Sequence, residues 1–214
     1  MSKERSEKRQ IKLLPVAANA ALIVLELVGT AISFRSGGAK NLKYYTVLSN
    51  VFALVSSIAF LCSYLRRGGK VSHIAGMMRY IASCCLALTF LTVIFVLVPM
   101  AIPYGTAANV LYKGAQIFHH IICPILSCVS FIFFEQGIEL PKKAYITAVA
   151  PTLTYAAVFV ILNLLKAVRG PYPFLHIYEQ PVYISVLWFM ILCGTALGAA
   201  ALISRLRKKF SKAS

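Results

Sequence analysis

The stretch ANVLYKGAQIFHHIICPILSCVSFIFFE, residues 108–135, decides how the rest of the chain is organised. It is long enough to cross a bilayer as a helix, yet its first half carries a lysine, a glutamine and two histidines. A lipid-facing helix does not carry polar groups in this way, because each would be unpaired in hydrocarbon. We therefore predict that this helix turns a polar face inward and that the other helices pack around it. Helical spacing assigns five side chains to that face: Asn109, Lys113, Gln116, His120 and Ser127.

Composition is typical of a polytopic membrane protein. Of the 214 residues, 59% are hydrophobic and 13% are charged, and the apolar residues form runs of about twenty. No polar segment is long enough to bury a core of its own, so we expect one all-α domain over residues 1–214. The net charge of +16 does not indicate a nucleic-acid partner, because the basic residues stand at the ends of apolar runs. Membrane lipids are the expected surroundings.

The apolar runs predict a bundle of six transmembrane helices. The first run is too long for a signal-peptide core and lacks a small-residue cleavage pattern, so we predict a retained helix. Sixteen of the 22 Lys and Arg residues fall on one side of such a bundle. This asymmetry predicts that both termini are cytoplasmic, in the cell membrane, and that the loop at 168–181 faces outward. The expected helices are 13–33, 44–65, 74–100, 108–134, 143–166 and 182–204.

The six cysteines all lie within apolar runs, and none forms a CxxC motif. Buried free thiols explain this distribution better than a disulfide framework or a zinc site, so neither a metal nor another cofactor is expected. Gly194 and Gly198 form a GxxxG pair that permits close helix packing. The hypothesis of a homo-oligomer rests on this pair alone.

Polar side chains from three helices are predicted to share one depth. Counted from the charged residue that ends each helix, Glu26, Asn50 and His120 lie within about 3 Å of one level, with Tyr155 a little deeper. Ionisable groups inside a membrane usually face a cavity or each other. The simpler alternative for an Asn or a His is an interhelical hydrogen bond. For Arg79, near a helix end, we expect a side chain that reaches the membrane surface.

Four segments carry a resemblance to a known family: KYYTVLSN (43–50), HHIICPI (119–125), Pro151 with Tyr155, and RGPYPF (169–174). Their order along nearly the whole chain resembles the bacterial six-span integral membrane family called Pr-six-Pr. That family is similar to the eukaryotic androgen-induced membrane proteins, which are hydrolases of fatty-acid esters of hydroxy fatty acids. The resemblance implies a six-helix membrane fold, and it implies a lipid ester as substrate.

The resemblance also implies a catalytic threonine and histidine. The threonine is Thr46, and the histidine is His119 or His120, of which the polar face favours His120 because His119 lies about 100° away from it. A threonine hydroxyl needs a base within hydrogen-bond reach, and a neutral imidazole can be that base. By helix rise, however, Thr46 lies about 7 Å above the level of His120, so that helix tilt or a kink has to close the gap.

Other polar residues have expected supporting roles. Asn50 or Gln116 can donate to an oxyanion, and Glu26 can orient the imidazole as the third member of a triad. Glu26 and His120 suit a proton relay as well as they suit catalysis. The alternative to a hydrolase is therefore a non-enzymatic membrane protein, either a small-molecule or proton-coupled carrier or a lipid-binding scaffold.

Overall fold

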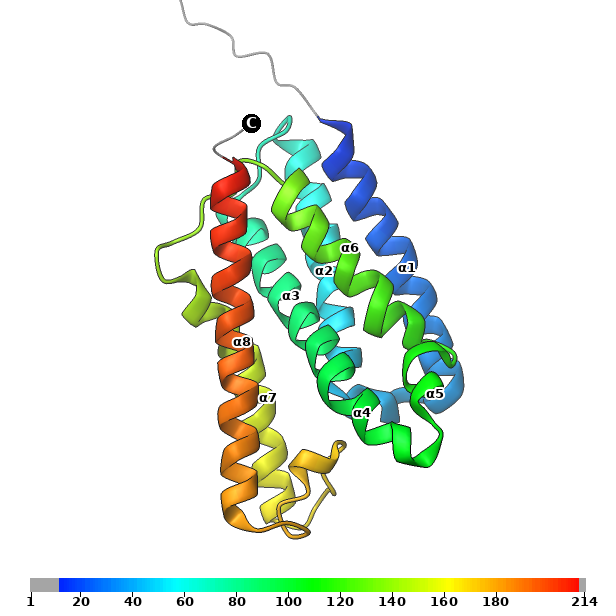
Figure 1. The fold of residues 1–214 in the computed structure, drawn as a ribbon. Helices are drawn as coiled ribbons and strands as arrows, with labels where there is room; N and C mark the ends of the chain where they lie inside the picture. Colours follow the sequence, from blue (N-terminus) through cyan, green and yellow to red (C-terminus); the bar gives the residue numbers. More distant parts are fainter. Residues whose placement is uncertain (1–11, 212–214) are drawn as a thin grey trace, which may run out of the picture.

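The computed structural model describes residues 12–211, and within them every regular element is a helix (Figure 1). The prediction of an all-α fold is confirmed for this part of the chain. In chain order the elements are α1 (Leu13–Gly37), η1 (Gly38–Lys43), α2 (Tyr45–Arg66), α3 (His73–Thr92), η2 (Val93–Leu97), α4 (Val98–Ala101), η3 (Ile102–Tyr104), α5 (Ala107–Tyr112), η4 (Phe118–Ile122), α6 (Cys123–Val129), η5 (Ser130–Phe134), α7 (Ala144–Leu164), η6 (Pro173–Leu175) and α8 (Val182–Ser211).

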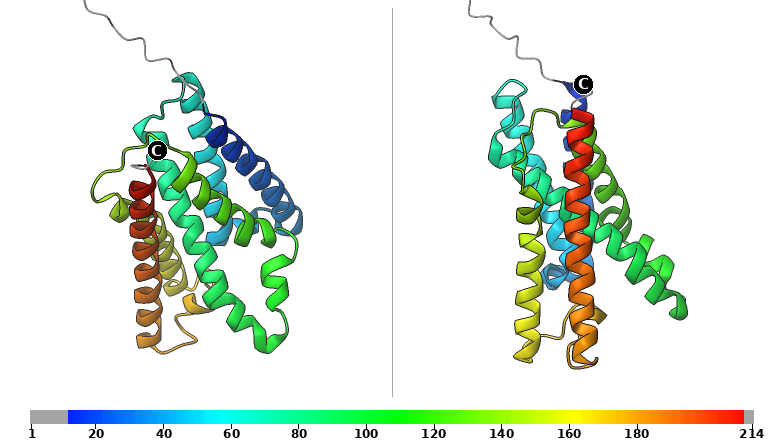
Figure 2. Two further views of the ribbon diagram at one scale, coloured as in Figure 1. Left: turned by 45° about the horizontal axis from the view of Figure 1, so that its top comes forward. Right: turned by 60° about the vertical axis from the view of Figure 1, so that its left-hand side comes forward.

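The long helices run back and forth along one bundle, and the start of α1 lies at the same end as the end of α8 (Figures 1 and 2). Among the described residues, five helical stretches are long and apolar enough to cross a membrane. The fourth expected helix is not among them, because its unbroken apolar part, Phe118–Phe134, is shorter. The basic N-terminal residues before Lys12, together with Lys212, lie outside the described part. The five stretches are Leu13–Lys43, Tyr45–Arg66, His73–Tyr104, Ala144–Leu164 and Val182–Ser211.

The helix expected over 108–134 is broken near its start. Its first part, α5, ends at Tyr112; Lys113 then has an extended backbone, and Gly114 has a left-handed one with φ of +62°. A left-handed residue cannot continue an α-helix, and glycine adopts this conformation without a steric penalty. The prediction of one continuous polar face was therefore wrong. Asn109 and Lys113 lie before the break, whereas both histidines lie after it in the π-helical turn η4.

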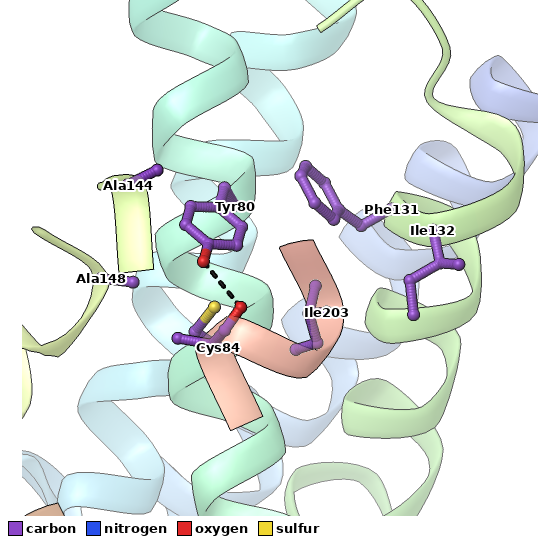
Figure 3. Packing of buried hydrophobic residues seen from close by; sticks show 8 residues of the cluster. Tyr80, Cys84, Phe131, Ile132, Ala144, Ala148 and Ile203 are labelled. Atoms are coloured by element: carbon purple, nitrogen blue, oxygen red, sulfur yellow. Dashed lines mark hydrogen bonds between the residues drawn. The ribbon is translucent and has the colours of Figure 1, made fainter. Parts of the chain in front are cut away.

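The apolar core lies where α3, η5, α7 and α8 meet (Figure 3). The rings of Tyr80 and Phe131 pack with their centroids 5.6 Å apart, and the alanines Ala144 and Ala148 let α7 approach them. The Tyr80 hydroxyl donates to the carbonyl oxygen of Ala200 at 2.8 Å. A buried phenol thus satisfies its one donor across the core and ties α3 to α8.

A buried ion pair lies at the end of the bundle where α3 begins and η5 ends. Arg79 Nη2 is 2.7 Å from Glu135 Oε1, and both side chains are fully buried. Glu135 also accepts hydrogen bonds from Asn19 and Ser130, while Arg207 of α8 donates to its backbone carbonyl. The expectation that Arg79 reaches the membrane surface was wrong. Its charge is compensated within the bundle, which permits complete burial.

Candidate functional site

A cavity of about 790 Å³ opens at the opposite end of the bundle, between the ends of α1 and α4, the start of α2 and the loop around residues 171–173. Thr46, Gln116, His119 and His120 all line it. Of the described residues that line the cavity, Lys113 is the charged one, so the cavity carries positive charge. Asn109 and Lys113 line it too, so the tertiary structure brings together six of the residues that the sequence analysis selected.

Thr46 lies in the first turn of α2 and is almost fully buried. Its backbone N–H donates to the phenol oxygen of Tyr172 at 3.3 Å, and its own Oγ1 lies 3.3 Å from the same oxygen. The first N–H groups of a helix have no partner within the helix, so Tyr172 satisfies one of them. Tyr172, the residue directly after Pro171 in the RGPYPF segment, is therefore in direct contact with the threonine hydroxyl.

His120 is held by a backbone carbonyl. Its Nδ1 lies 2.6 Å from the carbonyl oxygen of Val110 in α5. Because a carbonyl only accepts hydrogen bonds, Nδ1 carries the proton and Nε2 of the neutral ring is left as a proton acceptor. The break at Gly114 makes this contact possible, since it lets α5 fold back beside η4. Among the described residues, no hydrogen bond joins His120 or His119 to the hydroxyl of Thr46.

His119 points toward α1. A Cβ atom added at Gly29 would lie 2.9 Å from its Nε2, so any side chain larger than hydrogen at position 29 would displace the imidazole. The Nε2 atom is buried and has no hydrogen-bond partner within residues 12–211. The two histidines therefore differ: His120 has a set tautomer and His119 has an unpaired nitrogen.

Asn50 and Gln116, the two expected oxyanion donors, are in different situations. The Asn50 side-chain amide donates to the carbonyl oxygens of Thr46, at 2.7 Å, and His119, at 3.2 Å. Its two N–H groups therefore link α2 to η4 and hold the threonine segment beside the histidine segment. Gln116 lines the cavity, and its amide has no hydrogen bond among the described residues. The Gln116 amide is thus free to donate, whereas that of Asn50 is engaged.

Glu26 and Tyr155 lie away from this cavity. The Glu26 carboxyl is fully buried on α1, neither of its oxygens has a hydrogen-bond partner in the described chain, and its polar neighbour is the Cys123 thiol. No hydrogen bond connects Glu26 to either histidine. The Tyr155 hydroxyl donates to the carbonyl oxygen of Lys43 at 2.7 Å. For His120, the orienting position that a triad gives to a carboxylate is taken by the Val110 carbonyl.

Two groups at the site escaped the sequence analysis. Tyr172 belongs to the RGPYPF segment, which was selected for its resemblance but without a role for this side chain. Burial raises the pKa of the Tyr172 phenol above its ordinary value, so the hydroxyl keeps its proton and can act as a donor. The Val110 carbonyl has no side-chain signal in the sequence, because its role depends on the turn at Gly114.

The loop that carries Tyr172 is held at its surface by an ion pair. Arg169 Nη2 donates to Glu179 Oε2 at 2.7 Å, and this hydrogen bond lowers the pKa of the exposed Glu179 carboxyl. The His176 Nε2 lies 2.9 Å from the carbonyl oxygen of Gly170. These contacts link the two sides of the loop around Tyr172. Within residues 12–211, no group of three or more His, Cys, Asp or Glu side chains is placed to hold a metal ion.

Comparison with known proteins gives no match to a family model, a curated protein or a solved structure.

Proposed function

We propose that this protein is a multi-pass membrane hydrolase of lipid esters, in which Thr46 is the nucleophile and His120 the general base. The observation that carries the proposal is the cavity that Thr46, His119 and His120 line together, although they come from distant parts of the sequence. The resemblance of the KYYTVLSN and HHIICPI segments to the androgen-induced membrane hydrolases supports the same two residue types.

In the proposed reaction, Thr46 Oγ1 attacks the ester carbonyl carbon while its proton passes to His120 Nε2. The alcohol leaves with that proton. The same imidazole then takes a proton from water, whose oxygen attacks the acyl carbon, and returns that proton to Thr46 Oγ1 as the fatty acid leaves. In the resting structure the Thr46 hydroxyl contacts Tyr172. The first step therefore requires either a change of the Thr46 rotamer or one bridging water between the hydroxyl and the imidazole.

The negative charge on the carbonyl oxygen needs hydrogen-bond donors. The unengaged amide of Gln116 and the phenol of Tyr172 are the proposed donors, because both side chains line the cavity that contains Thr46. In this assignment Asn50 keeps Thr46 and His119 in place through their backbone carbonyls.

Removing the Tyr172 hydroxyl tests this assignment. We expect Tyr172→Phe to lower kcat/KM about 10²-fold, the usual effect of losing one oxyanion donor, with most of the loss in kcat. The matched control is Tyr178→Phe, in the same loop, whose exposed hydroxyl donates to the Leu164 carbonyl and should leave kcat/KM essentially unchanged. Equal kcat/KM values for Tyr172→Phe and the unmodified protein would remove Tyr172 from the reaction.

The proposal includes six crossings of the cell membrane with both termini in the cytoplasm. The excess of Lys and Arg on one side supports this orientation, as does the position of both described chain ends at one end of the bundle (Figure 1). The helix Phe118–Phe134 has 17 residues, which is the lower limit for a span at about 1.5 Å per residue.

Reporter fusions test the orientation. A reporter fused after Ser214 should be active on the cytoplasmic side, and one inserted within residues 168–181 should be active on the opposite side. The reason is that segments rich in Lys and Arg stay in the cytoplasm. Insertion of the reporter into the 66–72 loop provides a control for the cytoplasmic side. A cytoplasmic signal from the 168–181 insertion would contradict the proposed topology.

A proton-coupled carrier is the second candidate. Unpaired buried polar atoms favour it: within residues 12–211 the Glu26 carboxyl, the hydroxyls of Thr30 and Ser57, and His119 Nε2 have no hydrogen-bond partner. A carrier, however, needs a polar path that reaches both ends of the bundle. The fully buried Arg79–Glu135 pair occupies the end opposite the cavity, which makes the hydrolase the better-supported proposal.

The deciding experiment measures ester turnover by the purified protein. A panel of fatty-acid esters with different alcohols is incubated with the unmodified chain and with Thr46→Ala prepared in the same way. Turnover that disappears in Thr46→Ala supports the hydrolase. Equal turnover in both preparations, or none with any ester, contradicts it, and proton uptake by reconstituted liposomes then tests the carrier.

A further inference from the structure

A second cavity, of about 110 Å³, lies on the other side of Thr46, between α2, α3, α7 and α8. Its walls are mainly aliphatic and aromatic side chains, among them Leu88, Ala156, Trp188 and Leu192. Thr46, Leu97 and Tyr172 line both this apolar cavity and the cavity that contains the histidines. The threonine hydroxyl therefore lies on the partition between an apolar space and a polar one.

A groove of about 640 Å³ adjoins the apolar cavity. It runs between α2 and α7 over α3, and Tyr45 and Tyr155 line both the groove and the apolar cavity. Leu48 and Val158, which also line the groove, are 40% and 46% exposed on the apolar surface of the helices. The rings of Tyr45 and Tyr155 pack edge to face with their centroids 5.2 Å apart, so they form the wall between this groove and the cavity that Thr46 lines.

We propose that the apolar cavity binds one acyl chain of a lipid, which enters from the bilayer through this groove when the rings of Tyr45 and Tyr155 separate, and places its carbonyl end at Thr46. The inference deepens the proposed function by assigning the place of the acyl arm of the ester. The cavity has the volume of three to four water molecules at about 30 Å³ each. It therefore admits a short section of one unbranched chain next to the carbonyl, and the remainder of the chain lies in the groove.

The lining is mainly apolar and its polar atoms are mostly hydroxyls, so it disfavours a charged ligand, which would lose more hydrogen bonds to water than these hydroxyls replace. An acyl chain has apolar surroundings both in the bilayer and in the cavity, so the shape of the cavity decides which chains bind. Reducing the volume of the cavity should therefore reduce binding. The two neighbouring alanines Ala156 and Ala157 make this testable, because Ala156 lines the cavity whereas Ala157 is exposed on the outer face of α7.

The experiment uses a palmitic acid with a photoreactive diazirine in its chain, and a palmitoyl ester with the same diazirine, each added to the full-length protein in lipid nanodiscs. All variants carry Thr46→Ala, so that hydrolysis does not consume the ester. We expect labelled peptides from α7 and α8, and about tenfold less labelling when Ala156→Phe fills the cavity. Ala157→Phe adds the same side chain on the outer face and should label like its parent.

A second measurement does not require the Ala156→Phe variant to fold. Unlabelled straight-chain palmitate should compete with the label in the parent protein, whereas a fatty acid branched next to its carboxyl group should not. The inference fails when Ala156→Phe and Ala157→Phe label alike, or when the branched acid competes as well as palmitate. If α7 and α8 are labelled but the unmodified protein turns over no ester, only the proposed hydrolase function is contradicted. If the unmodified protein turns over esters but α7 and α8 are not labelled, only the proposed acyl-chain site is contradicted.

Discussion

Replacing Thr46 by alanine should abolish ester turnover, and replacing His120 by alanine should do the same. Each substitution removes one half of the nucleophile–base pair, for which we expect losses in kcat/KM of about 10⁴-fold or more. Because the two residues act as a unit, the double variant should be no worse than either single variant. Thr46→Ser keeps the hydroxyl and should retain measurable activity. The measurement is kcat/KM of each purified variant on the best ester of the panel.

His119→Ala is the matched control for His120→Ala. The two imidazoles are adjacent and line the same cavity, but only that of His120 has its tautomer set, through Nδ1 and the Val110 carbonyl, for proton acceptance at Nε2. We expect His119→Ala to retain activity. An inactive His119→Ala beside an active His120→Ala would transfer the role of the base to His119. Full activity of Thr46→Ala would exclude the proposed nucleophile.

Replacing Glu135 by alanine should lower the free energy of unfolding by about 3–5 kcal/mol, because it leaves the guanidinium of Arg79 buried without its counter-charge. The carboxylate accepts hydrogen bonds from Arg79, Asn19 and Ser130, so one substitution removes the centre of a network that joins α1, α3 and η5. The free energy is measured by denaturant unfolding in mixed micelles, with ester turnover measured separately.

Glu139→Ala is the control for this prediction, because Glu139 lies nearby in the chain and is exposed. Its stability should stay within about 0.5 kcal/mol of the unmodified protein, as is usual for surface substitutions. Replacing both partners, with Arg79→Met and Glu135→Leu, should cost less than Glu135→Ala alone, because no charge is then left unpaired. If Glu135→Ala lowers the free energy of unfolding by less than about 1 kcal/mol, the Arg79–Glu135 pair contributes no more to stability than a surface ion pair does.

Much of the fold could be predicted from the sequence because hydrophobic runs of membrane length are a strong local signal. The expected helices 44–65 and 143–166 correspond closely to α2 and α7. The expected helix 182–204 begins where α8 begins, and α8 runs on to Ser211. The residue types of the candidate site were also readable, since Thr46, Gln116, His119 and His120 are polar residues in or beside apolar runs.

The sequence by itself therefore determined the helical class, the approximate positions of the long apolar helices and the residue types of the candidate site. Tertiary structure alone decided their arrangement, because it depends on contacts between distant segments. A left-handed Gly114 interrupts the polar helix and brings the Val110 carbonyl to His120. Glu135 compensates the charge of Arg79, which a count of residues from the helix end cannot show. Tyr172 reaches Thr46 across 126 positions of sequence, since a hydroxyl without a partner at a buried helix start is costly and a folded loop supplies one.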